Sequence, residues 1–260
     1  MISTRSALGS KPALNDSGQA EPRGFFLRYA SPVLTAVLVD AAFFLKRLQR
    51  IYGNQPSEAA AKQLHRTALD HLNDEKGRRV SRLYRIFVYD APPAQWKGHQ
   101  LISRKSVDFS RSPVALWRQE FHDCLKSLRK VALRLGEIPT SHVNWQLKPD
   151  VLKMLATGER KWASITDEDF RLDFRQKGVD MRIGLDIASL AFKKQVSQIV
   201  LISGDSDFVP AAKLARREGI DFVLDPMWAT IRPELYEHID GLRSVCPKPE
   251  QVAANNKVGP

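Results

Sequence analysis

The stretch Gln198-Ile-Val-Leu-Ile-Ser-Gly-Asp-Ser-Asp-Phe208 decides the fold class of this chain. Its four consecutive apolar residues, Ile199–Ile202, are typical of a strand that is buried on both faces. A serine and a glycine end this run, and the carboxylates of Asp205 and Asp207 follow at once. Small and apolar residues then recur at helical spacing, so we expect a helix from about Phe208 onward.

The two acids therefore lie at the carboxyl end of an expected parallel strand, where open α/β sheets bind their ligands. Neighbouring carboxylates repel one another, and such a cluster often holds a cation. A structural alternative stays open at this point. Asp207 could cap the following helix, and Asp205 could be a solvated turn residue.

Further units of the same kind are expected on either side of this strand. Ile220–Leu224 forms a second strand, and the helix between the two fits a right-handed crossover. Val33–Val39 is another apolar strand, which ends in Asp40 and is followed by a helix. Tyr84–Tyr89 is a fourth strand, and it also ends in an acid, Asp90. The pattern predicts an α/β fold with a mainly parallel sheet.

Composition indicates the kind of partner. The 260 residues include 40 Lys and Arg against 29 Asp and Glu, a net charge of +11. This excess favours a polyanionic partner. No apolar run approaches the length of a membrane span, and the beginning of the chain lacks the apolar core of a signal peptide. With two cysteines and no Cys or His spacing typical of zinc sites, we expect a reduced, cytoplasmic protein without membrane contact.

The expected organisation is one domain between two tails. Residues 1–30 are rich in Ser, Gly, Pro and Asn, which predicts a disordered N-terminal tail. Residues 31–245 form the domain, with helical insertions near 53–80 and 91–165, and residues 246–260 are expected to be a flexible C-terminal tail. A homo-oligomer is compatible with this sequence, which does not specify one.

Positive charge gathers in two segments. Basic residues cluster in 76–85, and residues 97–135 hold nine basic residues against three acids. Arg129, Lys130 and Arg134 belong to the second segment, and we expect them to contact a nucleic-acid backbone beside the acidic pocket.

A third acidic segment completes the expected site. Residues 175–180 open a helix with Asp180 near its start, and small residues on this helix are expected to let it approach the sheet. Strand ends and helix starts at one edge of a doubly wound sheet can converge, which would bring together Asp40, Asp180, Asp205 and Asp207. An all-oxygen pocket of this kind suits Mg²⁺ or Mn²⁺.

Three segments carry a resemblance to a known family: Val37-Leu-Val-Asp40, Lys177-Gly-Val-Asp-Met-Arg-Ile-Gly-Leu-Asp186 and Leu201-Ile-Ser-Gly-Asp-Ser-Asp-Phe208. The chain resembles the NYN domain family of PIN-like, metal-dependent ribonucleases over about residues 33–243. The resemblance implies a PIN-like or Rossmann-like three-layer fold, Mg²⁺ or Mn²⁺ as cofactor, and RNA rather than DNA as substrate.

The family's acids correspond to the four named above, and these are the expected catalytic and metal-binding residues. Asp186 is a further candidate metal ligand, although six residues after Asp180 is about 240° around a regular helix. It could share the site only if Asp180 is the helix N-cap. Arg175 and Lys177 are candidate phosphate contacts, with a solvated surface position as the alternative. Many family members carry an Asn three residues after the first acid, and this chain has Phe43 there.

Two other functions stay open on the sequence alone. One is a non-catalytic nucleic-acid adaptor on the same fold, which the missing Asn and the basic surface suggest. The other is a glycosyltransferase, because Asp205-Ser206-Asp207 matches the DxD pattern of enzymes that hold a metal and a nucleotide sugar. The strand that ends at Asp40 lacks a Gly-rich nucleotide loop, which counts against the glycosyltransferase.

Overall fold

A computed structural model describes residues 33–139, 143–174 and 177–255 of the chain. The expected disordered tail of residues 1–30 and the candidate phosphate contact Arg175 lie outside the described residues. All described residues fall within one compact unit.

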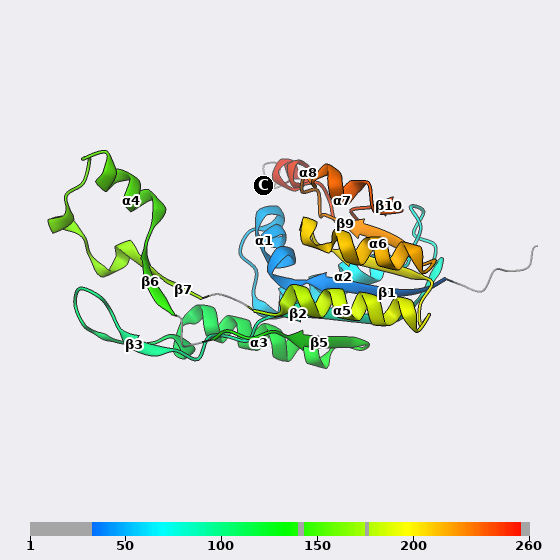
Figure 1. The fold of residues 1–260 in the computed structure, drawn as a ribbon, viewed down its shortest axis with the longest axis horizontal. Coiled ribbons are helices and arrows are strands. Elements are labelled where there is room, and N and C mark those ends of the chain that lie inside the picture. The colour runs from blue at the N-terminus through cyan, green and yellow to red at the C-terminus, as the bar shows by residue number, and fades with distance from the viewer. Residues whose placement is uncertain (1–32, 140–142, 175–176, 256–260) are drawn as a thin grey trace, which may run out of the picture. The chain divides into compact units, whose positions relative to one another are not determined.

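The centre of this unit is a six-stranded sheet with the order β10-β9-β8-β1-β2-β5, in which every pairing is parallel (Figure 1). The expected α/β, PIN-like fold class is therefore confirmed. The strands are β1 (Val33–Asp40), β2 (Ser81–Asp90), β5 (Val131–Leu135), β8 (Gln198–Ile202), β9 (Asp221–Asp225) and β10 (Gly241–Leu242).

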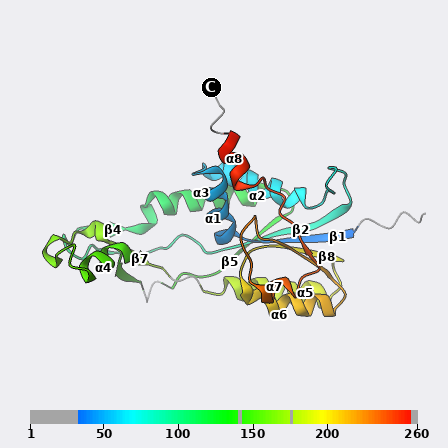
Figure 2. The ribbon, with the colours of Figure 1, turned by 90° about the horizontal axis from the view of Figure 1, so that it is seen from above.

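Helices cover both faces of the sheet and give three layers, as Figure 2 shows. One face carries α1 (Ala41–Tyr52), α2 (Ser57–Asp70), α3 (Pro113–Ser127) and α8 (Pro249–Asn255), and the other carries α5 (Val179–Phe192), α6 (Val209–Arg217) and α7 (Pro233–Tyr236). Short 3-10 turns lie at η1 (Phe109–Arg111), η3 (Trp162–Ser164), η4 (Asp167–Asp169) and η5 (Ser206–Phe208). None of the helices in the described part of the chain has the length and apolarity that crossing a membrane requires.

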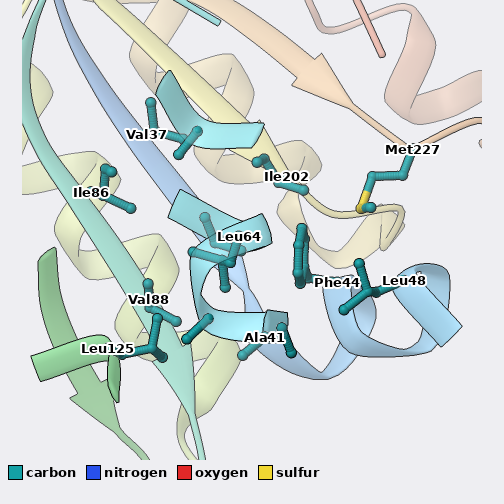
Figure 3. Packing of buried hydrophobic residues seen from close by; sticks show 14 of the residues in the cluster. Val37, Ala41, Phe44, Leu48, Leu64, Ile86, Val88, Leu125, Ile202 and Met227 are labelled. Carbon is teal, nitrogen blue, oxygen red and sulfur yellow. The ribbon is translucent and has the colours of Figure 1, made fainter. Parts of the chain in front are cut away.

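The alternation of side chains along β1 divides the core in two. Val37 and Val39 pack with α1, α2 and α3, where Phe44 and Leu64 are fully buried (Figure 3). Ala36 and Leu38 point to the opposite face and pack with α5 and α6. Because successive residues of a strand face opposite sides, an apolar run is needed where both sides are covered.

The boundaries of the expected insertions differ from the structure. Helix α2 belongs to a sheet-covering layer, and the segment from α3 to β5 supplies both a covering helix and an edge strand. Two parts of residues 91–165 neither join the central sheet nor cover it. They are the hairpin of β3 (Lys97–His99) with β4 (Ser106–Asp108), and the start of a second hairpin. This second hairpin pairs β6 (Asn144–Leu147) with β7 (Phe170–Asp173) and carries α4 (Pro149–Ala156) between them.

The two hairpins contact each other. The indole Nε1 of Trp145 donates to the carbonyl of His99 at 3.0 Å, and its ring meets Trp96 edge-on with the ring centroids 6.0 Å apart. Segments separated in sequence thus share one small cluster, which alternation and turn signals alone could not indicate.

The structure also differs from the expected C-terminal tail. Residues 249–255 form helix α8, Cys246 is buried, and Val252 packs against the core on the α1 side. Cys246 and Val252 cover part of the core, which explains why this segment folds on the domain.

The strand order places β1 between β2 and β8. The chain leaves β1 toward β2 and β5 on one side, then returns to β8 and continues to β9 and β10 on the other. Val39 pairs with Ile202, so the carboxyl ends of β1 and β8 lie side by side. This is the topological switch point at which open α/β sheets hold ligands.

The start of α5 is held by a backbone pairing between Glu137, which follows β5, and Lys177. Their amides and carbonyls exchange hydrogen bonds of 3.0 and 2.9 Å. Gly136 makes this approach possible, since a Cβ there would lie 2.7 Å from the carbonyl oxygen of Lys177 and 2.7 Å from Val179 Cγ2. Gly184, in contrast, has open space around it and does not serve the close sheet packing expected of this helix.

These two glycines give a matched test. Gly136→Ala should lower the free energy of unfolding by roughly 1–3 kcal/mol, because backbone and a buried valine must move. Gly184→Ala should raise it by roughly 0.5–1 kcal/mol, because Ala is favoured inside a helix. Urea unfolding of both variants measures this. Equal effects of the two substitutions would contradict the role given to Gly136.

Candidate functional site

Asp40 ends β1 and begins α1. Its Oδ1 accepts a hydrogen bond of 3.1 Å from the amide of Phe43, so the carboxylate caps the helix. Burial raises the pKa of Asp40 to about 6, and the negative charges of Asp180 and Asp90 act in the same direction. The folded protein thus holds this carboxylate in a position that disfavours its charge.

The end of β8 meets Asp40 through a serine. Ser203 is fully buried, and its Oγ lies 3.4 Å from Asp40 Oδ2 and 3.4 Å from the backbone nitrogen of Asp205. Asp205 Oδ1 in turn accepts from the amide of Asp207 at 3.0 Å and caps η5. Helix α6 has no side-chain cap, so Asp207, which is exposed, does not cap it. Asp205 therefore has a structural role in its loop. Asp207 does not have the helix-capping role that the structural alternative assigned to it.

Asp180 is the second residue of α5. The N-cap is Gly178, whose φ of 77° is the left-handed conformation that glycine adopts readily. The condition under which Asp186 could share the site, with Asp180 as the N-cap, is therefore not met. Partial burial, and then the charges of Asp205 and Asp207, raise the pKa of Asp180. The three helix- and loop-borne acids are therefore close enough to repel one another, and Asp180 also acts on Asp40.

The outer strands show a contrasting arrangement of acids. Asp90, which ends β2, is fully buried and lies 2.7 Å from His122 Nε2 and 3.3 Å from Arg118 Nε. Asp225, which ends β9, is also fully buried and lies 2.8 Å from His71 Nε2. Each of these carboxylates has a partner that can balance its charge.

The central acids have no such partner. Asp40, Asp180, Asp205 and Asp207 form no ion pair with any residue that the structure describes, although the chain carries a net charge of +11. These four carboxylates lie at the switch point, between the strand ends of Asp90 and Asp225, whose charges have partners. This contrast is the main electrostatic feature of this edge of the sheet. An added cation would remove their mutual repulsion.

The sequence analysis gave no role to His71 or His122 and missed these pairs. His122 is 32 positions from Asp90, and His71 is 154 positions from Asp225. The helical pattern of the segments gave the only available signal, because it places both histidines near the inward faces of helices. Which strand-end acid they reach depends on the topology.

Asp186 has partners outside the set of four acids. Its Oδ2 accepts from the hydroxyl of Tyr89 at 2.7 Å and lies 3.4 Å from Arg134 Nε. Burial, followed by the hydrogen bond to Asp186, raises the pKa of Tyr89. The structure thus places both Asp186 and Arg134 in a contact between α5, β2 and β5.

The two other expected backbone contacts lie at the opposite edge of the sheet. Arg129 and Lys130 precede β5, whereas the acids follow the carboxyl ends of their strands. They line a cavity of about 370 Å³ together with His65, Arg79 and Arg82. The expectation that they lie beside the acidic pocket is therefore wrong. Parallel strands of this sheet separate the two ends, and β2 with its 10 residues spans roughly 30 Å.

The donor chemistry of the central acids fits a hard divalent cation, because every candidate ligand atom is an oxygen. Among the described residues, however, no group of three or more His, Cys, Asp or Glu side chains is arranged closely enough to hold an ion. Binding would therefore require these side chains to turn inward, which Asp180, Asp205 and Asp207 can do because all three are exposed.

Phe43 occupies the position where many NYN members carry Asn. A Cβ on Gly204 would lie 2.8 Å from Cε2 of the Phe43 ring, so the ring packs directly on the loop between Ser203 and Asp205. The aromatic side chain thus supplies a loop contact and no polar group.

The raised pKa of Asp40 predicts a pH-dependent effect in the metal-free protein. Between about pH 4 and 6 the folded protein keeps a proton on Asp40 that the unfolded chain has lost, so stability falls as pH rises through this window. Asp40→Asn cannot ionise and still offers an acceptor to Phe43. The free energy of unfolding of Asp40→Asn, relative to that of wild type, should rise across this window by on the order of 1–3 kcal/mol. Above the window the difference should stay constant.

Thermal unfolding in EDTA between pH 3 and 8 measures this difference. Asp123→Asn is the control, because the pKa of Asp123 is lowered by hydrogen bonds from Lys126 and Gln119. That control should gain no stability as pH rises. Parallel pH profiles for Asp40→Asn and wild type would refute the electrostatic account of Asp40.

Comparison with known proteins agrees with the sequence resemblance. The model of the NYN domain family matches residues 121–231. No curated protein matches the chain. Two similar solved structures are a protein of unknown function from Vibrio parahaemolyticus RIMD 2210633 and a noncanonic maltogenic alpha-amylase from Thermotoga neapolitana.

The Vibrio protein is 14% identical with a TM-score of 0.46, over 85% of this chain and 97% of that chain. The amylase is 9% identical with a TM-score of 0.20, over 81% of this chain and 48% of that chain. The family match includes Asp180, Asp205 and Asp207, and Asp40 precedes it. The match to the NYN domain model over residues 121–231 thus agrees with the family that the sequence resembles.

Proposed function

We propose that this protein is a metal-dependent nuclease that hydrolyses phosphodiester bonds of RNA. The observation that supports this most directly is the set of uncompensated carboxylates at the β1–β8 switch point of a NYN-containing fold. The flanking acids Asp90 and Asp225 have histidine partners, so the absence of cations is specific to the centre of this edge in the described structure.

In this proposal the ligands are Asp40 and Asp205, which approach each other through Ser203. One or two Mg²⁺ or Mn²⁺ ions bound there would supply the Lewis acidity that activates water and stabilises the departing oxygen. Asp180 and Asp207 would hold a second ion or orient the attacking water. Ser203 keeps the two strand ends in register through its contacts with Asp40 Oδ2 and the nitrogen of Asp205.

The charge of the chain supports a polyanionic substrate. A net charge of +11 attracts a phosphate backbone, and Lys177 lies on the segment that leads directly into Asp180. RNA is chosen over DNA because the NYN family resemblance favours it.

A second candidate function is a nucleic-acid adaptor that binds without cleaving. The packing of Phe43 on Gly204 favours it, because the ring takes the place of a polar group beside Asp40. The glycosyltransferase alternative is no longer favoured, because the DxD residues Asp205 and Asp207 fall inside the NYN match.

Asp205→Asn separates the enzyme from the adaptor. It removes a charge while keeping an oxygen that can accept from the amide of Asp207, so the protein should fold and bind RNA as before. Mn²⁺-dependent cleavage of a labelled RNA should fall by a factor of 100 or more, on the order expected when a catalytic metal is lost. Asp123→Asn, at an exposed position on α3, is the control.

Wild-type RNA binding without cleavage in Mg²⁺ or Mn²⁺ would favour the adaptor. Equal cleavage by wild type and Asp205→Asn would show that the activity resides elsewhere or comes from a contaminant.

The basic cavity at the amino edge gives a separate prediction. Arg79 donates to the Ser81 carbonyl and Lys130 to the Leu83 carbonyl, whereas Arg82 and Arg129 are exposed and pair with no carboxylate that the structure describes. If a long RNA reaches this edge, Arg82→Glu with Arg129→Glu should weaken binding. It should also reduce the slope of log K against log salt by about 1.4 for two lost phosphate contacts.

The control for net charge is Lys62→Glu with Lys126→Glu, because both lysines are exposed and already pair with acids on their own helices. The measurement is RNA affinity between 50 and 200 mM salt. Equal loss of affinity in both double variants would show that only overall charge matters, and would remove the amino-edge cavity from the RNA path.

A further inference from the structure

A cavity of about 710 Å³ lies between α1 and α3. Its walls include Ala42, Leu45 and Gln49 from α1, and Val114, Trp117 and Arg118 from α3. These positions recur at helical spacing along each helix, so one stripe of α1 faces one stripe of α3 across the opening. The volume falls in the usual range for small-molecule sites.

This cavity opens at the same edge of the sheet as the acidic cluster. Ala42 comes two residues after Asp40, and its amide contributes to the hydrogen bonding of that carboxylate. On the other wall, Arg118 Nε lies 3.3 Å from Asp90, whose charge in turn acts on Asp40. One wall is therefore next to Asp40 in the chain, and the other contacts Asp90 at the neighbouring strand end.

The lining has the chemistry of a nucleobase site. Trp117 stacks on the buried ring of Phe121, with centroids 5.4 Å apart and an interplanar angle of 12°. Its Nε1 donates to the carbonyl of Gln55 at 3.0 Å, so the ring is held in place. Aromatic faces stack on bases of any sequence, and nearby amide side chains can bond to base edges.

The charges at the opening favour a nucleic acid as the occupant. Lys46 is exposed and lines the cavity, as does Arg118, which also pairs with Asp90, and no Asp or Glu is among the lining residues. An apolar cavity with cations at its edge suits a base that is attached to phosphates. A second copy of this chain would have to bring apolar side chains past the same cations.

We propose that the cavity between α1 and α3 binds the base of a nucleotide that flanks the phosphate held at the acidic cluster. This inference rests on the proposed function, since it assigns a substrate subsite to the same edge. It makes the protein a reader of unpaired nucleotides, because a base must leave its stack to enter a cavity of this kind.

The chain offers a matched pair of variants for the test. Val114 is 69% exposed and lines the cavity, and Leu116 is 58% exposed on the same helix and does not line it. Val114→Glu and Leu116→Glu change net charge equally and leave the core intact. Binding of a single-stranded, non-cleavable 2′-O-methyl oligonucleotide should weaken several-fold for Val114→Glu and stay near wild type for Leu116→Glu.

Trp117 tests the stacking itself. Trp117→Ala should weaken binding on the order of 5- to 100-fold, and Trp117→Phe should restore most of the loss because a ring remains. The two variants are compared by thermal unfolding, since Trp117 also packs against the core. An oligonucleotide with 5-iodouridine should crosslink to Trp117 in the wild-type protein.

Each outcome of these experiments is decisive. Crosslinking at Trp117, together with weaker binding by Val114→Glu alone, supports the subsite. If Val114→Glu and Leu116→Glu change the affinity of the wild-type protein equally, or if the oligonucleotide crosslinks only elsewhere, this inference is overturned. The proposed function would not be affected by either result. Failure of the wild-type protein to bind any oligonucleotide overturns both. Loss of cleavage in Asp205→Asn with an unchanged Trp117 crosslink would support both.

Discussion

The pairing of β1 with β8 is the constraint on which this edge of the protein depends. It joins segments that are 163 positions apart, through the register of Val39 with Ile202 and the contact of Asp40 with Ser203. Because both strands are buried on both faces, a slip by one residue would move apolar side chains out of one core and into the other. The positions of Asp40 and Asp205 are thereby fixed by packing, although neither acid contributes to it.

The acids at this edge fall into two groups, those that have partners and those of the proposed site. Asp90 and Asp225 are buried and have histidine partners, so they connect strand ends to helices. Asp40 and Asp180 have raised pKa values and no cationic partner among the described residues. Their burial, and then the repulsion between neighbouring acids, costs stability in the metal-free protein, and binding of a cation would recover it. This cost is the physical link between the fold and the proposed chemistry.

Sequence reasoning reached the parts that local patterns determine. The apolar runs around Ile199–Ile202 and Val33–Val39 predicted the parallel sheet, and they placed Asp40 and Asp205 at or just beyond the ends of two strands, which the structure shows to be neighbours. It could not place Arg129 at the opposite edge, because charge counts carry no direction along a strand. It also missed the pairing of His122 with Asp90, which depends on how α3 crosses the sheet. Long-range contacts of this kind have no signature in spacing or period.

The most direct test of the account is to locate a bound ion. Crystals soaked in Mn²⁺ and measured at the manganese absorption edge would show its position by anomalous scattering. The account predicts a peak about 2 Å from carboxylate oxygens of Asp40 and Asp205, with Asp180 or Asp207 turned toward it. No peak at that place in saturating Mn²⁺, or a peak only at the paired acids Asp90 or Asp225, would contradict it.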